Sequence, residues 1–407
     1  MTAQTACRPG PLSGLRVLDF TALLQGPLAT QILGDLGADV IKIEAPEGDT
    51  VRYGAPMRNP GMGAIFLHLN RNKRSLVLDL KQPAGREALL RLAATADVLV
   101  YNVRPQAMAR LKLTYEDVRA ANDKIIYVGA YGFSQRGPYA AKPAYDDLIQ
   151  GMVALPSLIR QAGADRPRFV PSTMCDRITG LNTVNAVTAA LFHRERTGKG
   201  QAVEVPMFES LTQFVLSDHM AGQTFEPPRG PMGYARLLAE HRAPYETRDG
   251  YLCLLAYNDK QWRNFFVMIG SAETFDNDPR FSTQTARSQH IAEIYAFVAD
   301  HMRTRTTAEW LEALTAADIP AMPLNSLEDL LHDPHLNDTG FFSLVMHPTE
   351  GPLRSMAVPS TWSESQPETP RPAPRLGEHS IEVLREAGYS AIEIESLITA
   401  GVTLSVA

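Results

Sequence analysis

The amino-acid sequence predicts an α/β protein with a large domain and a smaller one. Between residues 15 and 206, short apolar runs alternate with stretches whose apolar residues recur every three or four positions, the pattern of strands alternating with helices. From residue 225 a linker-like segment rich in Pro and Gly interrupts this alternation, and mainly helical patterns follow. At 407 residues the chain is long enough to form two hydrophobic cores.

The predicted fold begins with a βαβ unit. Residues 15–20 form an apolar strand, Gly26-Pro27 opens a helix that ends at Gly37, and residues 39–44 form the next strand. Proline is favoured in the first turn of a helix and glycine just past its end. Crossovers of this kind are right-handed and join parallel strands. Because the loop after the first strand lacks G-x-G-x-x-G, the unit does not indicate a dinucleotide site.

The rest of the chain extends this pattern. We expect strands at 75–80, 97–102, 124–130 and 201–206, and helices at 81–96, 108–111, 114–122, 181–194 and 207–220. Residues 228–325, with a hairpin and three helices, form the predicted smaller domain. Residues 1–227 and 326–407 form the large domain, to which the last part adds two strands within 341–358 and a helical tail. Residues 102–105 leave the C-terminal end of a strand, where open α/β sheets bind ligands.

Bulk composition narrows the class of function. The net charge is −6 and the pI about 6.0, so no nucleic-acid partner is indicated. The three cysteines are widely spaced and give neither a disulfide framework nor zinc spacing, and we expect no metal and a reducing, cytoplasmic location. The sequence shows no apolar signal core and no apolar run long enough to span a bilayer, so no membrane partner is expected.

Asp176 is the candidate catalytic residue. It stands at the entry of a long apolar helix, where unpaired backbone N–H groups and the helix dipole favour an ionised carboxylate. One interpretation is an N-cap, for which Asp is among the best residues. The other is a carboxylate nucleophile that forms covalent acyl intermediates. The neighbouring Cys175 could be a thiol nucleophile, but a small buried residue is its commoner role.

Basic residues recur at the ends of the predicted strands in the first half of the chain. They are Arg52, Lys73, Arg74, Lys81, Arg104 and Arg110. Arg and Lys form strong charge-assisted hydrogen bonds to phosphate, so their shared placement suits a phosphorylated ligand. Each one taken alone is equally well explained as a solvated surface charge.

Several stretches, in the same order along the chain, resemble the class III CoA-transferases. They are 12–20, Gly26-Pro27, 37–44, 70–75, 143–146, Asp176 with Gly180, 197–201 and 376–379. The resemblance implies a Rossmann-like large domain built from both chain ends, a smaller α+β domain and an interlocked homodimer. It also implies a transferase that moves CoA from an acyl-CoA to a carboxylic acid, with no permanently bound cofactor and CoA as substrate. Succinyl-CoA is the expected donor.

The resemblance also implies a mechanism for Asp176. Its carboxylate attacks the thioester of the acyl-CoA, giving a mixed anhydride and free CoA thiolate. The thiolate returns to form an aspartyl-CoA thioester, which the incoming carboxylate attacks. The second anhydride is resolved to the new acyl-CoA. A carboxylate is a poor nucleophile in water, so the site must position it, exclude water and supply donors to the oxyanion.

By position, the resemblance assigns further residues to CoA binding. They are Leu24, Gln25, Leu78, Lys81, Asn102, Val103, Arg104, Arg110, Ala144 and Tyr145. Gln25 is one position later than the family's glutamine, and Arg52 is the candidate substitute for an arginine that is Ala45 here. The glycine-rich flap of formyl-CoA transferase is absent, so formyl and oxalate are not the expected substrates.

Three other functions remain open at this point. The family includes α-methylacyl-CoA racemases, but those have a histidine where this sequence has Tyr145, and Tyr is a poor base near neutral pH. A non-catalytic CoA-binding protein is the second alternative, against which Asp176 and Gly180 both speak. A nicotinamide dehydrogenase would suit the fold but lacks the glycine fingerprint.

Overall fold

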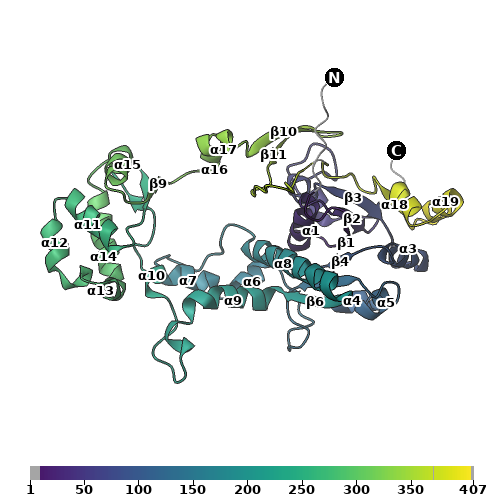
Figure 1. The fold of residues 1–407 in the computed structure, drawn as a ribbon, viewed down its shortest axis with the longest axis horizontal. Helices are drawn as coiled ribbons and strands as arrows, with labels where there is room; N and C mark the ends of the chain where they lie inside the picture. The colour runs from purple at the N-terminus through teal and green to yellow at the C-terminus, as the bar shows by residue number, and fades with distance from the viewer. Residues whose placement is uncertain (1–9, 370, 405–407) are drawn as a thin grey trace. The chain divides into compact units, whose positions relative to one another are not determined.

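The computed structural model describes residues 10–369 and 371–404, and the chain separates into two compact units. The larger unit contains Met1–Ile149, Ser172–Thr212 and Pro334–Ala407. The smaller contains Gln150–Pro171 and Gln213–Asp333, so it includes the segment 228–325 expected as a separate domain and adds residues before and after it. Figure 1 shows the course of the chain through both units.

The larger unit is built on a six-stranded parallel sheet, which confirms the expected α/β class. Its strands are β1 (Arg16–Phe20), β2 (Asp39–Glu44), β3 (Lys73–Val77), β4 (Val98–Tyr101), β5 (Ile126–Tyr131) and β6 (Gln201–Pro206). The order is β3-β2-β1-β4-β5-β6, so the direction of winding reverses between β1 and β4. Strands buried on both faces need nearly continuous Val, Ile and Leu, which is the composition that made them recognisable.

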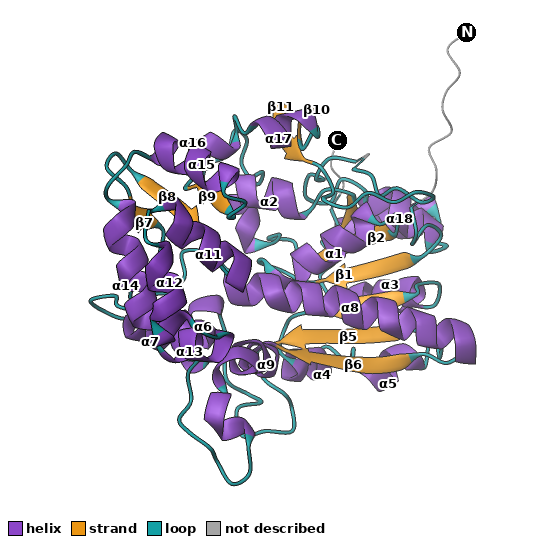
Figure 2. Cartoon of the chain, turned by 60° about the vertical axis from the view of Figure 1, so that its left-hand side comes forward, coloured by secondary structure: helices purple, strands orange, loops and turns teal. Residues whose placement is uncertain are grey.

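Helices cover both faces of this sheet. On one face, α1 (Gln25–Asp35) and α8 (Met174–Thr197) pack against alternate strand residues such as Val17, Val98 and Val128. The intervening residues, such as Leu18 and Leu99, face the other helices. Those are α3 (Pro83–Ala93), α4 (Pro105–Arg110), α5 (Tyr115–Arg119), α18 (Ser380–Glu386) and α19 (Ala391–Thr399). Figure 2 shows α8 running along the sheet.

The end of the chain completes the larger unit beside β3. Ser380 Oγ accepts a hydrogen bond from the Val77 N–H, and Thr403 Oγ1 donates to the Val77 carbonyl. Arg74 on β3 bonds Glu382 and Glu386 of α18. The unit also contains η1 (Thr50–Tyr53), α2 (Ala64–Leu69), α17 (Pro334–Asp338) and the hairpin β10 (Phe342–His347) and β11 (Gly351–Met356). Both ends of the chain therefore build one unit.

The smaller unit has a core rich in aromatic residues and a three-stranded antiparallel sheet. Its strands are β7 (Tyr245–Glu246), β8 (Tyr251–Leu254) and β9 (Ala321–Pro323). Its helices are α7 (Leu155–Gln161), η2 (Ala221–Thr224), α10 (Ala235–Leu238), α11 (Asp259–Met268), α12 (Ala272–Asn277), η3 (Pro279–Phe281), α13 (Gln284–Gln289), α14 (Ile291–Met302), α15 (Thr307–Ala316) and α16 (Leu327–Leu330). Two helices, α6 (Asp146–Met152) and α9 (Met207–His219), cross the boundary between the units.

The strand after residue 70 differs from the prediction. It was expected at 75–80 but begins at Lys73 and ends at Val77. Lys73 and Arg74 are therefore inside the sheet, both nearly fully buried. Lys73 Nζ lies 2.9 Å from Asp19 Oδ2, and Arg74 bonds Asp39. Charged residues that a sequence pattern assigns to a solvated turn can enter a strand when carboxylates on neighbouring strands pair with them.

Candidate active site

Asp176 lies in the first turn of α8, and the expectation that it is the N-cap is wrong. The helix begins at Met174, and Asp176 is its third residue. Thr173 occupies the N-cap position, but its side chain makes no capping hydrogen bond in the described part of the chain. The N–H of Asp176 instead donates to Asp146 Oδ1, at 2.9 Å. A carboxylate distant in sequence therefore replaces the local cap.

The surroundings of Asp176 favour its neutral form. Burial is the larger cause, repulsion by the Asp146 carboxylate adds to it, and attraction to Arg177 opposes both; together they raise the pKa of Asp176 to about 7. The sequence argument from the helix dipole gave the opposite sign, because it took no account of burial or of Asp146. Near neutral pH the side chain therefore exists in both protonation states.

Gly180 brings α1 close to the catalytic end of α8. A Cβ at Gly180 would lie 2.9 Å from the Gln25 carbonyl oxygen and 3.1 Å from Leu28 Cδ2. Asp176 stands four residues before Gly180, so the two share one face of the helix, and that face is turned toward the start of α1. The pairing of Asp176 with Gly180 is thus explained by packing as well as by chemistry.

Gln25 offers a hydrogen-bond donor near this position. It is 5% exposed, and its Nε2 has no hydrogen-bond partner among the described residues. A buried amide donor left without a partner costs free energy and is usual only where something else binds it. Leu24, the residue before α1, is partly buried and belongs to the same loop.

Asn102 holds the loops on the two sides of the point where the strand order reverses. Its Nδ2 donates to the Ala22 carbonyl at 2.7 Å, and its Oδ1 accepts from the Ala22 N–H at 2.9 Å. The loop after β1 is thereby fixed to the loop after β4. Val103 is partly exposed and Arg104 is exposed beyond it. This edge of the sheet is where ligands of open α/β folds bind.

A hollow of about 670 Å³ lies beside the starts of α3 and α4. It brings together Lys81 and Arg110, which the sequence assigned to CoA binding from segments far apart in the chain. Its lining residues are Leu80, Lys81, Gln82, Pro83, Arg86, Ala107, Arg110, Leu111 and Lys112. Sequence reasoning missed Arg86 and Lys112, because only the packing of α3 against α4 reveals that they share this hollow.

The structure does not support Arg52 or the Leu78 side chain as CoA contacts. Arg52 is fully buried and donates to both carboxylate oxygens of Glu44, at 2.7 and 2.6 Å. Its guanidinium also lies 3.8 Å from the centre of the Phe66 ring. Leu78 is 1% exposed and packs in the sheet's hydrophobic core. Both residues hold the fold together at this place.

Ala144 and Tyr145 lead into α6. Ala144 lies so close to Gly132, just after β5, that a Cβ at Gly132 would be 2.2 Å from that of Ala144. Tyr145 is 60% exposed. Asp146 follows directly and contacts Asp176, so this segment reaches the candidate site through Asp146.

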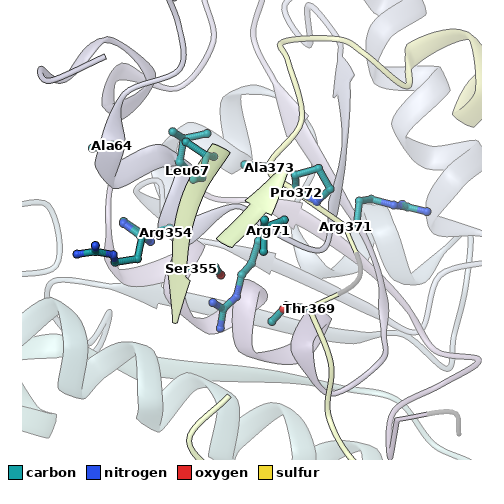
Figure 3. Close-up of a pocket in the computed structure, with 12 residues that line it drawn as sticks. Ala64, Leu67, Arg71, Arg354, Ser355, Thr369, Arg371, Pro372 and Ala373 are labelled. Atoms are coloured by element: carbon teal, nitrogen blue, oxygen red, sulfur yellow. The ribbon is translucent and has the colours of Figure 1, made fainter. Parts of the chain in front are cut away.

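A second hollow, of about 200 Å³, lies among α2, the β10–β11 hairpin and residues 369–373, outside every residue assigned from the sequence. Figure 3 shows Arg354 and Arg371 on opposite sides of it, with their guanidinium groups directed apart. Arg71, also at its edge, is held by Asp35 at 2.7 Å. The charges do not converge on one point, as an anion site would require.

Comparison with known proteins identifies the family. The model of CoA-transferase family III matches residues 12–380. The chain belongs to this family. The family III CoA-transferase described here is 34% identical over 390 residues to the succinate–glutarate CoA-transferase of Agrobacterium fabrum, covering 93% of this chain and 96% of that one. It is 33% identical over 413 residues to a formyl-CoA:oxalate CoA-transferase of Escherichia coli, covering 95% and 98%.

A solved structure agrees with this assignment. A CAIB/BAIF family protein from Brucella suis matches this CoA-transferase with a TM-score of 0.78 and 31% sequence identity, covering 93% of this chain and all of that one. The described residues of the CoA-transferase contain no helix with the length and apolar character needed to cross a bilayer. Nor do they hold a cluster of three or more His, Cys, Asp or Glu side chains suited to a metal ion.

Proposed function

We propose that this CoA-transferase moves CoA from an acyl-CoA, with succinyl-CoA as the first donor to test, to a carboxylic acid through covalent intermediates on Asp176. One observation carries the proposal: a carboxylate in the first turn of α8 whose burial and neighbouring charge raise its pKa to about 7. The names of the similar succinate–glutarate enzymes support succinyl-CoA and a dicarboxylic acceptor.

The chemistry asks three things of Asp176. It must be ionised to attack, it must be shielded from water, and it must become a good leaving group once acylated. Near pH 7 about half of the molecules carry the ionised form, if the pKa is about 7. A carboxylate of raised pKa is also more basic, and basicity accompanies nucleophilicity. Partial burial limits hydrolysis of the anhydride and of the aspartyl-CoA thioester.

The proposed first step is balanced within the substrate and Asp176. A carboxylate oxygen bonds to the thioester carbon, the carbon–sulfur bond breaks, and CoA leaves as a thiolate. The buried Gln25 amide, which has an unpaired Nε2 among the described residues, is our candidate donor to the oxyanion that forms on the way. The thiolate then attacks the aspartyl carbonyl and releases the donor acid.

For CoA itself we propose a path along the C-terminal edge of the sheet. Lys81 and Arg110 bind its phosphates in the hollow beside α3 and α4, with Arg86 and Lys112 adding positive charge. Leu24, Asn102, Val103 and Arg104 lie where the strand order reverses, between that hollow's helices and the start of α1, and Ala144 and Tyr145 lie next to Asp146. A Rossmann-like large domain, an interlocked homodimer and a cytoplasmic location, all expected from the sequence, are part of the proposal.

The decisive experiment is intact-protein mass spectrometry after incubation with succinyl-CoA. Hydroxylamine should convert the intermediate to a hydroxamate at Asp176, and borohydride should reduce the thioester at the same residue. The Asp176→Asn variant should bind CoA but show neither change. A panel of acyl-CoAs that gives no adduct despite CoA binding would reject the proposal. Exchange of an α-proton in heavy water would then test for a racemase.

A further inference from the structure

Asp146 makes a direct contact with the backbone of the proposed nucleophile. It is the first residue of α6 and is 7% exposed. Its Oδ1 accepts the N–H of Asp176 at 2.9 Å, across thirty positions of sequence. Both residues belong to the larger unit, so this bond lies within one compact body. A charge-assisted bond to a backbone N–H in the first helical turn restrains the position of that turn.

The same contact brings two carboxylates close together. Asp146 raises the pKa of Asp176 through repulsion, second only to burial. The other titratable or charged groups near this turn come from three elements: Cys175 and Arg177 on α8, Asp147 on α6, and His68 on α2. Arg177 attracts the Asp176 carboxylate and partly offsets Asp146. Asp147 is exposed, so water weakens its effect.

We propose that Asp146 is a positioning residue of the transferase: it fixes the Asp176 backbone at the start of α8 and makes the free Asp176 carboxylate less stable than its acylated form. This inference rests on the proposed function of Asp176. When a carboxylate oxygen of Asp176 bonds to the acyl carbon and the thiolate leaves, Asp176 loses its negative charge. The repulsion by Asp146 ends at that step, so acylation gains free energy that attack by an isolated carboxylate would not.

Three variants separate the charge of Asp146 from its hydrogen bond. Asp146→Asn removes the charge and keeps an oxygen that can accept the Asp176 N–H. Asp146→Ala removes both. Asp147→Asn removes the same charge from the next residue, which is exposed on the same helix, and serves as the matched control. Thermal unfolding shows which variants remain folded before any other comparison is made.

The first readout needs no catalysis. Carbon NMR of labelled aspartates follows the titration of Asp176 in each variant. We expect the pKa of Asp176 to fall by on the order of one unit in D146N and to stay unchanged in D147N. Hydrogen exchange at the Asp176 amide should remain slow in D146N and become faster in D146A. An Asp176 pKa that is the same in D146N as in the wild type would overturn the inference.

The second readout is the rate of adduct formation with succinyl-CoA. In D146N the acid limb of the pH profile should move to lower pH, while the fraction of acylated enzyme at equilibrium falls roughly tenfold for each unit of lost pKa. A purely structural Asp146 would leave the pH profile of D146N unchanged. If wild type forms no adduct, the proposed function fails, and the NMR titration still decides whether Asp146 acts on Asp176.

Discussion

At the scale of the residue, Asp176 meets two opposing requirements. Attack on a thioester needs the ionised carboxylate, whereas burial and the neighbouring Asp146 favour the neutral acid. A pKa of about 7 lets the side chain satisfy both near neutral pH. Activity that depends on the ionised form should therefore rise with pH through this value.

The change Asp176→Asn tests this through stability. The pKa of Asp176 is about 7 in the folded protein against an ordinary value of 3.8. A raised folded-state pKa costs the wild type stability as the pH rises from about 4 to about 7, because the unfolded chain releases its proton first. Asn carries no such cost, so D176N should gain on the wild type across this window by on the order of 2 kcal/mol.

Urea unfolding at a series of pH values measures this difference. The gain of D176N should be smallest at the acid end and level above the folded-state pKa. D147N, which removes an exposed carboxylate nearby, should show no comparable trend. A difference between D176N and wild type that does not vary with pH would contradict a raised pKa for Asp176.

Single residues also show where sequence reasoning fails. Arg52 looks the same in a sequence whether it binds a phosphate or lies buried against Glu44, since nothing local to it records the partner. Asp146 was noted only as the residue after a tyrosine, because its contact with Asp176 is created by the fold. Asp176 itself was found from its place before an apolar helix and from the family resemblance.

At the scale of the element, α8 shows how propensity and packing divide the work. Its apolar part was predicted from 181, but the helix begins at Met174. The missed turns contain Cys, Asp, Thr and Gly, which are weak helix formers, and a bond from another helix supports their start. The strands were predicted more closely, and 39–44 and 201–206 match β2 and β6 throughout.

The change Gly180→Ala tests the close approach of α1 to α8. Alanine is normally worth about 1 kcal/mol over glycine inside a helix. Here its Cβ would meet the Gln25 carbonyl at 2.9 Å, which requires α1 to shift. We expect a net loss of stability of about 1–3 kcal/mol and a larger loss of acylation rate, because the Gln25 amide moves with α1.

Gly151 in α6 gives a matched control, since a Cβ there would have no neighbour within 4 Å. Gly151→Ala should be neutral or stabilising. Chemical unfolding and single-turnover adduct formation measure the two effects of Gly180→Ala separately. Equal behaviour of the two alanine variants would show that the packing at Gly180 does not restrain α1.

At the scale of the whole molecule, the site is assembled from segments that a sequence cannot bring together by inspection. The fold class, the parallel sheet and the edge where ligands bind followed from strand composition and from the order of the elements. The hollow at Lys81 and Arg110 required the packing of α3 against α4. The units also divide differently from the predicted domains, because residues 150–171 carry no linker composition to mark them.

The double change Lys81→Ala with Arg110→Ala tests the proposed CoA path. Each cation removed from a phosphate should weaken CoA binding roughly tenfold, so the pair should lose about a hundredfold while the protein remains folded. Isothermal titration with CoA and with dephosphorylated CoA shows which phosphate is involved. Lys199→Ala, at an exposed turn after α8, is the control and should bind as the wild type does. Undiminished binding by the double variant would place the phosphates elsewhere.

The closure of the larger unit by the last residues has a consequence for synthesis on the ribosome. Val77 bonds Ser380 and Thr403, partners 303 and 326 positions later in the chain. The outer edge of β3 therefore stays uncovered while the whole smaller unit is being translated, and a bare strand edge invites pairing with other chains. The smaller unit can become compact during that interval. A nascent chain of this length needs protection at β3 until its final segment has emerged.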